Sequence, residues 1–403
     1  MKIYEIGTGY TPIPAQMGAA TEIVVEELTK SLLKLGKDVT IVDIKADNRA
    51  KTDLPIIEVA VPKKFSGTDI QLGFMHKLKR VVYSIALAYT LKRMLKNTKE
   101  KVVLHFHNQY NMYFFLKLVP RRLREKCYLA YTNHSYIWHG EWSKIKDTVR
   151  KRYFQEIYAM QHADCIYVLN NITKETLVKH LNIPIQKIVL VDNGVNTEIY
   201  SPLNSGDVEQ IKGRLGLQGK KVFVQIGSVC DRKNQLGALE LLTPTLKQDK
   251  NSVFIYAGGI IDAEYQERIT TYAKEHGFKP QVLYFGEVRP GKSLNELYAI
   301  SEAMIFPSKS EGFSLVIIEA MAAGVPVIIH ESLQFKLAEE CCRYRNSSDF
   351  QETLKNLILN LEEQMNLSHK VREVVVKNYS WDKIAADYYK SWEVGGLDES
   401  LKF

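Results

Sequence analysis

Two glutamates, Glu311 and Glu319, lie on either side of the start of an apolar segment in the C-terminal half of the chain. Residues 307–327 predict a loop, a turn, a helix that carries Glu319 and then a buried strand, because a glycine and a proline end the helix. Gly312 leaves room for a close ligand, and the free N–H groups of the first helical turn favour an anion. A carboxylate at each end of an anion-binding turn suits a sugar nucleotide.

This stretch resembles the donor-site signature of retaining glycosyltransferases with the GT-B fold, in the large family 4 group. An ordinary loop–helix–strand unit with two incidental acids is the alternative. The resemblance implies an α/β protein of two Rossmann-like, doubly wound domains that face a cleft. It places the donor sugar and diphosphate on the residues at the helix start, which are Gly312, Phe313, Ser314 and Leu315.

The resemblance also implies how such an enzyme reacts. Glu319 would accept hydrogen bonds from the nucleotide ribose, and Glu311 would lie near the hydroxyls of the donor sugar. In retaining members the acceptor attacks on the face from which the diphosphate leaves, and a phosphate oxygen takes the proton. The protein then positions the substrates and neutralises charge, with Lys233 and the helix-start N–H groups as candidates. We expect no metal and no cofactor, since there is no Asp-x-Asp motif and the nucleotide sugar is a co-substrate.

A second loop, which begins at Gly227, follows a predicted strand and leads into a helix. The family usually has an arginine directly after this glycine and a lysine further on, and both hold the donor diphosphate. Lys233 matches the lysine, whereas Ser228 occupies the arginine position. Arg232 could supply the missing charge, although a serine is no substitute for a bidentate phosphate ligand. The alternative for Arg232 is a solvent-facing loop residue.

Three histidines lie on or just after predicted strands. His134 follows the strand at 128–132, at the carboxyl end where open α/β sheets bind ligands. The resemblance puts a histidine here close to the reacting sugar. His105 and His107 alternate on another strand, and with Asn108 they could line the acceptor side. A zinc site is the alternative for this pair, but the sequence shows no third ligand at a suitable spacing.

Two further sites follow from the resemblance with less specificity. Gly9 lies in a glycine-containing loop after the first strand, where it could approach the donor, although Gly-x-Gly alone is a weak signal. Val288 lies in a loop that meets the nucleotide base in the family, often through backbone atoms. The sequence therefore leaves the base, the sugar and the acceptor open.

Short apolar runs alternate with amphipathic helical patterns along the chain, which is typical of doubly wound parallel sheets. We predict an acceptor-binding domain at 1–200, a donor-binding domain at 201–380 and a terminal helix at 381–403 that crosses back toward the first domain. Helices are expected at 21–35 and 72–97. The predicted strands are 2–6, 38–44, 102–106, 128–132, 165–169, 221–226, 253–257, 282–285, 303–306 and 325–329.

The positive charge of the chain belongs to its first half. Residues 1–200 hold 30 Lys and Arg against 19 Asp and Glu, whereas 201–403 hold 24 against 27. A basic half can serve an anionic membrane surface or an acidic substrate, and a merely solvated positive surface is the alternative. The helix at 72–97 could lie on a membrane or pack on the sheet. Nucleic acid is not an expected partner, since no nucleic-acid-binding module is recognisable.

The five cysteines are odd in number and lack a C-x-x-C spacing, so we expect reduced thiols rather than disulfides or structural zinc. No leader is recognisable and no apolar run reaches the ~18 residues of a membrane span. We expect a cytoplasmic protein that can associate peripherally with the inner membrane face.

The expected function is transfer of a sugar from a nucleotide-diphosphate sugar to a glycan or lipid-linked acceptor, in cell-surface polysaccharide or glycolipid synthesis. A sugar-nucleotide epimerase or a phosphorylase on the same scaffold is one alternative, because fold does not determine function. A non-catalytic two-domain ligand-binding protein is the other.

Overall fold

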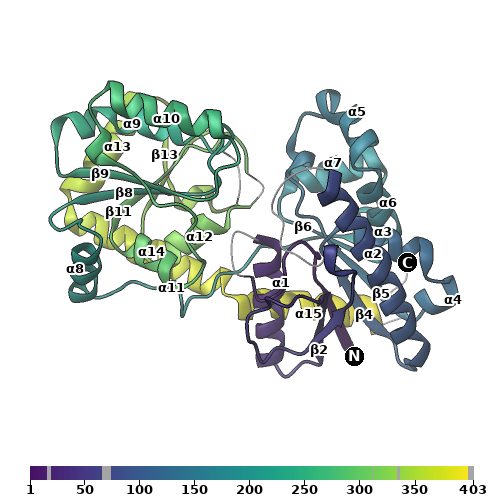
Figure 1. The fold of residues 1–403 in the computed structure, drawn as a ribbon. Coiled ribbons are helices and arrows are strands. Elements are labelled where there is room, and N and C mark those ends of the chain that lie inside the picture. The colour runs from purple at the N-terminus through teal and green to yellow at the C-terminus, as the bar shows by residue number, and fades with distance from the viewer. Residues whose placement is uncertain (16–19, 66–73, 312, 334–335, 398–403) are drawn as a thin grey trace. The chain divides into compact units, whose positions relative to one another are not determined.

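The computed structural model describes residues 1–15, 20–65, 74–311, 313–333 and 336–397 of the 403-residue chain. The chain divides into two compact units (Figure 1). Unit 1 comprises Met1–Gly194 together with Trp381–Phe403, and unit 2 comprises Val195–Ser380. The division therefore falls at Gly194, slightly before the boundary at residue 200 that the sequence predicted.

The described residues of unit 1 form a seven-stranded parallel sheet with the order β3-β2-β1-β4-β5-β6-β7. The strand order changes direction between β1 and β4, and open α/β sheets bind ligands at the carboxyl ends of the strands at such a switch point. The register of these two strands pairs Glu5 with His105. The strands are β1 (Lys2–Ile6), β2 (Val39–Ile44), β3 (Ile56–Val59), β4 (Val102–Phe106), β5 (Cys127–Thr132), β6 (Cys165–Val168) and β7 (Ile188–Leu190).

Helices flank this sheet, and the last helix of the chain belongs to the same unit. Helix α15 packs against α1, where Nζ of Lys34 lies 2.6 Å from Oδ2 of Asp382. The helices are α1 (Ala20–Lys34), α2 (Phe74–Asn97), α3 (Gln109–Leu118), α4 (Arg121–Arg124), α5 (Trp142–Arg152), α6 (Phe154–His162), α7 (Asn171–Leu181) and α15 (Trp381–Leu397), with short 3-10 turns at Lys63–Phe65, Tyr136–His139 and Ile185–Lys187.

Unit 2 repeats the design with a six-stranded parallel sheet among its described residues, in the order β10-β9-β8-β11-β12-β13. Its switch point lies between β8 and β11. The strands are β8 (Lys221–Ile226), β9 (Ser252–Ala257), β10 (Val282–Tyr284), β11 (Ser301–Phe306), β12 (Val327–His330) and β13 (Cys342–Tyr344). The helices are α8 (Ser205–Arg214), α9 (Gln235–Gln248), α10 (Ala263–Glu275), α11 (Lys292–Ala299), α12 (Leu315–Ala322), α13 (Ser347–Leu359) and α14 (Leu361–Tyr379), with 3-10 turns at Lys279–Gln281 and Lys336–Glu340.

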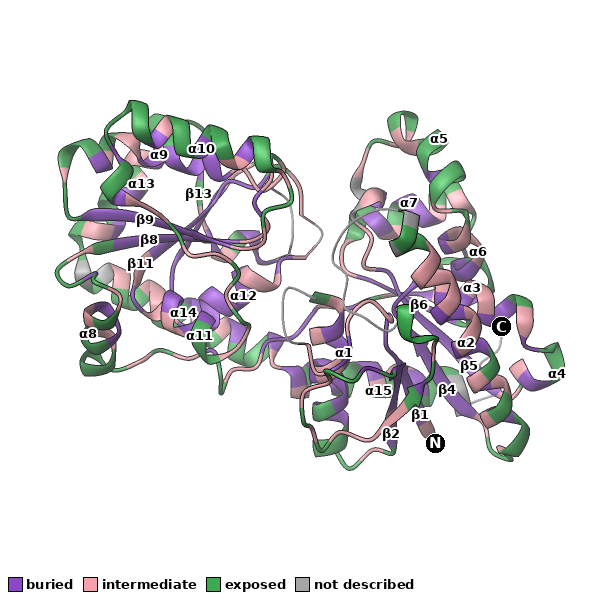
Figure 2. Cartoon of the chain, viewed as in Figure 1, coloured by how far each residue is buried: buried purple, intermediate pink, exposed green. Residues whose placement is uncertain are grey.

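The central strands are buried on both faces while the helices expose their outer sides (Figure 2). All six residues of β5 and of β9 are buried, which explains the continuous apolar runs in the sequence. Three strands that the sequence did not predict, β3, β7 and β13, lie at sheet edges. Edge strands are short and bury one flank less completely, so their apolar signal is weak.

Helix α2 packs into the core of unit 1. Tyr83, Leu87 and Leu91 are almost completely buried there, so this apolar side of the helix is not available to a membrane. No helix in the described part of the chain combines the length and the apolar character that crossing a membrane requires.

Candidate functional site

Unit 2 brings three charged side chains together at its switch point. Nζ of Lys233 lies 2.6 Å from Oε1 of Glu311, and Nη1 of Arg232 lies 3.0 Å from the same oxygen. The hydroxyl of Ser308 also donates to this oxygen at 2.6 Å. The two cations follow β8 and Glu311 follows β11, and these neighbouring parallel strands end at the same edge. One carboxylate therefore neutralises two cations in this structure.

The lysine of this cluster is well enclosed. Only 11% of the Lys233 side chain is exposed, and burial lowers its pKa although the nearby Glu311 carboxylate opposes the shift. The absence of a side chain at Gly227 leaves space for the Lys233 side chain. A Cβ at Gly227 would lie 3.3 Å from Cε of Lys233, and the φ of +147° is one that only glycine adopts readily. The site thus depends on a glycine next to its main cation.

Arg232 is partly exposed but is not a free surface residue. Its Nη1 also donates to the carbonyl of Ser310 at 2.9 Å, and its own carbonyl accepts from the N–H of Lys309 at 2.9 Å. These bonds tie the loop after β8 to the loop after β11. Arg232 therefore stands where it could compensate for Ser228.

The hydroxyl of Ser314, at the start of helix α12, neither caps the helix nor bonds to another described residue. Ser314 precedes the helix in an extended conformation and its side chain does not cap it. The Ser314 Oγ atom is buried without a hydrogen-bond partner in the described part of the chain. Phe313 and Leu315 are partly buried against the core of unit 2, and Gly312 lies outside the described residues. A helix N-terminus with an unused hydroxyl is suited to an anion.

The second glutamate of the signature is inside unit 2. Glu319 is 6% exposed, and the hydroxyl of Tyr298 donates to its Oε2 at 3.2 Å. Burial raises the pKa of Glu319 to about 7, against the hydrogen bonds from Tyr200 and Tyr298, which lower it. The two oxygens of this carboxyl can accept further hydrogen bonds from a ligand.

Val288 lies in the loop that follows β10, and it is partly buried against the core of unit 2. The same loop is tied to the end of β9 by a hydrogen bond from the N–H of Gly258 to the carbonyl of Gly286, at 2.8 Å. The carboxyl ends of the parallel strands share one edge, so Val288 lies at the same edge of unit 2 as the charged cluster.

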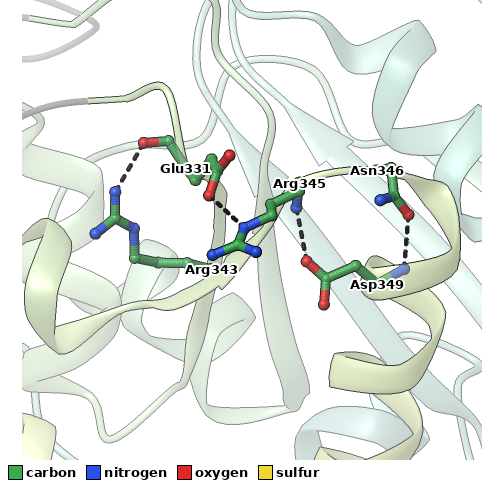
Figure 3. Close-up of a pocket in the computed structure, with 5 residues that line it drawn as sticks. All are labelled: Glu331, Arg343, Arg345, Asn346 and Asp349. Atoms are coloured by element: carbon green, nitrogen blue, oxygen red, sulfur yellow. Dashed lines mark hydrogen bonds and ion pairs between the residues drawn. The ribbon is translucent and has the colours of Figure 1, made fainter.

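A separate polar hollow occurs at the ends of β12 and β13 (Figure 3), lined by Glu331, Arg343, Arg345, Asn346 and Asp349. Nε of Arg345 lies 2.7 Å from Oε2 of Glu331, and the N–H of Arg345 donates to Asp349 at 2.8 Å. These groups bond to one another, and the hollow shares no residue with the predicted donor site.

Unit 1 contains the other predicted residues. Gly9 follows β1 with a φ of +78°, and a Cβ there would lie 2.1 Å from the ring of Tyr83. Both the backbone conformation and the space therefore require glycine. Asn108 is buried, caps helix α3 through the N–H of Tyr110 and donates to the hydroxyl of Tyr10 at 2.6 Å. The guanidinium of Arg80 covers the Tyr10 ring at 4.2 Å.

His105 and His107 meet at Glu5, a residue that the sequence did not single out, and His134 contacts His107. Nδ1 of His105 lies 3.0 Å from the Glu5 carboxylate, and Nε2 of His107 lies 2.9 Å from Oε2 of the same group. Nδ1 of His107 then lies 3.0 Å from Nε2 of His134. The strand register explains the first contact, since Glu5 and His105 are paired residues of β1 and β4.

Two expectations about these histidines need correction. His105 is 0% exposed and its Nε2 bonds to Thr132 at 2.7 Å, so it does not line an acceptor surface in this structure. His107 is 4% exposed and likewise uses both ring nitrogens. The sequence also showed no third ligand beside the pair, but Glu5 provides a third ligand-type group. Spacing along the chain could not reveal it, although an acid within a buried strand was a usable signal.

Solved structures share the fold of the whole chain. Sucrose-phosphate synthase from Thermosynechococcus elongatus superposes with a TM-score of 0.73 at 18% identity, over 97% of this chain and 98% of that chain. The two doubly wound units therefore define a GT-B fold.

The family follows from the sequence. The family model described as "Glycosyltransferase Family 4" matches residues 21–199, and the one described as "Glycosyl transferases group 1" matches residues 207–374. Together the two matches cover most of the chain, and the chain belongs to the GT-B glycosyltransferases of family 4.

Two curated relatives have names that state a particular reaction or product. The Escherichia coli UDP-Gal:alpha-D-GlcNAc-diphosphoundecaprenol alpha-1,3-galactosyltransferase is 26% identical over 60% of this chain and 60% of its own length. The Streptococcus pneumoniae alpha-galactosylglucosyldiacylglycerol synthase is 26% identical over 53% of this chain and 55% of its own length. The chain thus spans little more than half the length of these relatives.

Proposed function

We propose that this chain is a retaining glycosyltransferase that moves a sugar from a nucleotide-diphosphate sugar to a glycan or lipid-linked acceptor. The observation that carries the proposal is the Lys233–Glu311 pair, with Glu311 three residues before Ser314, whose buried hydroxyl at the start of α12 has no hydrogen-bond partner among the described residues. A diphosphate bound here would compete with Glu311 for the two cations and accept hydrogen bonds from Ser314 and the helix start.

The remaining residues of unit 2 fit the same ligand. Glu319 is buried within helix α12 and would accept hydrogen bonds from the ribose. The loop that carries Val288 would meet the base through its backbone. Once the diphosphate pairs with Lys233 and Arg232, the Glu311 carboxylate would be free to accept hydrogen bonds from the hydroxyls of the donor sugar.

The reaction we propose needs no metal ion and no cofactor. The acceptor oxygen forms the new bond to the anomeric carbon while the bond to the diphosphate breaks on the same face, and the acceptor proton passes to the leaving phosphate oxygen. Lys233, Arg232 and the N-terminus of α12 would neutralise the charge that develops on the diphosphate. His134 would contact a hydroxyl of the reacting sugar.

The acceptor we propose is lipid-linked, in glycolipid or cell-surface polysaccharide synthesis at the inner membrane face. The Escherichia coli relative is named for a diphosphoundecaprenol-linked sugar, and the Streptococcus pneumoniae relative is named as the synthase of a diacylglycerol glycolipid. The excess of basic residues in 1–200 supports an anionic lipid or glycan acceptor for unit 1.

The test is a donor screen that measures released nucleoside diphosphate from UDP-, GDP- and ADP-sugars, with and without a lipid extract. UDP-galactose is the first donor to try, because the Escherichia coli relative is named for it. Lys233→Ala and Glu319→Ala should abolish most of the release. Lys309→Ala is the matched control, since Lys309 lies in the loop that carries Glu311, is exposed and pairs with Asp231 at 2.7 Å.

Other results of the donor screen would contradict parts of this proposal. Conversion of the nucleotide sugar without an acceptor would indicate an epimerase. Tight binding of a nucleotide sugar without turnover on any acceptor would indicate a binding protein. An inverted product stereochemistry would contradict the retaining mechanism while leaving the transferase class intact.

A further inference from the structure

An unbroken chain of hydrogen bonds runs from a buried carboxylate to a partly exposed histidine in unit 1. Glu5 contacts His107 at 2.9 Å, and His107 contacts His134 at 3.0 Å. Glu5 is 0% exposed, whereas the His134 side chain is partly exposed. Among the residues that the structure describes, none bonds to Nδ1 of His134. The chain therefore ends at a ring nitrogen that a ligand can use.

The chemistry of the groups determines the direction of each hydrogen bond. An ionised carboxylate only accepts, so Nε2 of His107 must carry the proton that it donates to Glu5. A neutral imidazole then has a bare Nδ1, so Nε2 of His134 must carry the proton for the next bond. By the same rule, Nδ1 of a neutral His134 is bare and can only accept.

We propose that Glu5 sets the tautomer of His134 through His107, so that Nδ1 of His134 is held as the acceptor for a substrate hydroxyl. This inference rests on the proposed function, in which the hydroxyl belongs to the reacting sugar. Glu5 and His107 are then positioning residues that touch no substrate.

The electrostatics of the cluster agree with these protonation states. Burial alone would raise the pKa of Glu5, but attraction to His105 and the hydrogen bonds from both imidazoles lower it to about 2. Burial, followed by repulsion from His105, lowers the pKa of His107 to about 4. Burial and the neighbouring imidazoles His107 and His105 lower the pKa of His134 well below its usual value. The carboxylate is therefore charged and these two rings are neutral near pH 7.

Two arms of hydrogen bonds start from the Glu5 carboxylate, one through His107 and one through His105. The arm through His105 serves as a matched comparison for the arm through His107. His105 donates from Nδ1 to the ionised Glu5, and its Nε2 lies 2.7 Å from the hydroxyl oxygen of Thr132. Tyr388 lies 3.2 Å from the same hydroxyl oxygen. Both arms are buried and polar, but only the arm through His107 leads to His134.

The direct test is the ¹⁵N NMR spectrum of histidine-labelled protein near pH 7, in which each ring nitrogen reports whether it carries a proton. We expect His134 to be a single tautomer with the proton on Nε2, and His134→Ala identifies its signals. A proton on Nδ1, a doubly protonated ring or a mixture of tautomers would overturn the inference. The measurement needs no substrate, so its result does not depend on whether the protein transfers a sugar.

Variants then test the path. His107→Phe keeps a ring in the core but removes the acceptor, so His134 should lose its fixed tautomer and kcat should fall about tenfold, the scale of one hydrogen bond. The same change in a His134→Ala background should have no further effect on kcat. Thr132→Val alters the other arm and should leave the His134 signals unchanged. Unchanged His134 signals in His107→Phe, or equal shifts in Thr132→Val, would show that His107 is not the path.

Discussion

The carboxylate of Glu311 lies directly beside the ammonium group of Lys233, with Oε1 and Nζ 2.6 Å apart. Arg232 shares the same oxygen. This pairing lowers the free energy of the ligand-free protein, and in the function we propose a bound diphosphate would have to displace the carboxylate. Glu311 is therefore expected to affect binding and turnover in opposite directions.

Glu311→Gln should separate these two effects. The neutral amide no longer competes with the diphosphate for Lys233 and Arg232, so the nucleoside diphosphate should bind several-fold more tightly, by about 1 kcal/mol. Turnover of the nucleotide sugar should fall, because the carboxylate no longer reaches the sugar hydroxyls. Isothermal titration with UDP and steady-state kinetics measure the two effects. Weaker UDP binding together with unchanged kcat would contradict this role of Glu311.

The affinity for the nucleotide should depend on the ionisation of Glu319. Its pKa is raised to about 7 in the ligand-free protein, and the ionised form is the better acceptor for ribose hydroxyls. Affinity should therefore rise as the pH increases from about 6 to 8, the range that brackets this pKa. Glu319→Gln serves as the control, because it keeps the shape but cannot ionise. Equal pH profiles for UDP binding to the two proteins would exclude Glu319 as the titrating group.

The buried imidazole of His107 should make unit 1 sensitive to acid. Its pKa is lowered from 6.5 to about 4, so the unfolded chain binds a proton in this range and the folded protein does not. The stability from the neutral ring is complete above about 6.5 and is lost as the pH falls toward 4. The difference in unfolding free energy between the wild type and His107→Phe should therefore shrink on acidification. Chemical denaturation at a series of pH values measures it, and a constant difference would argue against a neutral buried His107.

Transfer should continue in the presence of a chelator. Lys233 and the start of α12 can neutralise a diphosphate, and the ligand-type atoms of Glu5, His105 and His107 are already hydrogen-bonded to one another. Activity measured in EDTA should equal activity without it, and metal analysis of the purified protein should show no stoichiometric zinc. Loss of activity that magnesium or manganese restores would contradict the metal-free reaction.

Much of the fold could be predicted from sequence because its central strands are buried on both faces. A continuous apolar run such as the one in β9 can be recognised as a buried strand without any tertiary information. The short edge strands β3, β7 and β13 lack that signal, since their residues are partly exposed. The loop–helix–strand signature around Glu311 and Glu319 is also local, so the sequence alone determined the donor-site candidates in unit 2.

Only the tertiary structure decided what these residues touch. The pairing of Lys233 and Arg232 with Glu311 depends on two loops that follow neighbouring strands β8 and β11. The contact of Glu5 with His105 and His107 depends on the parallel register of β1 and β4, which joins residues about a hundred positions apart. Periodicity specifies which residues are buried, but strand order and register specify which buried polar groups meet, and these are properties of the whole sheet.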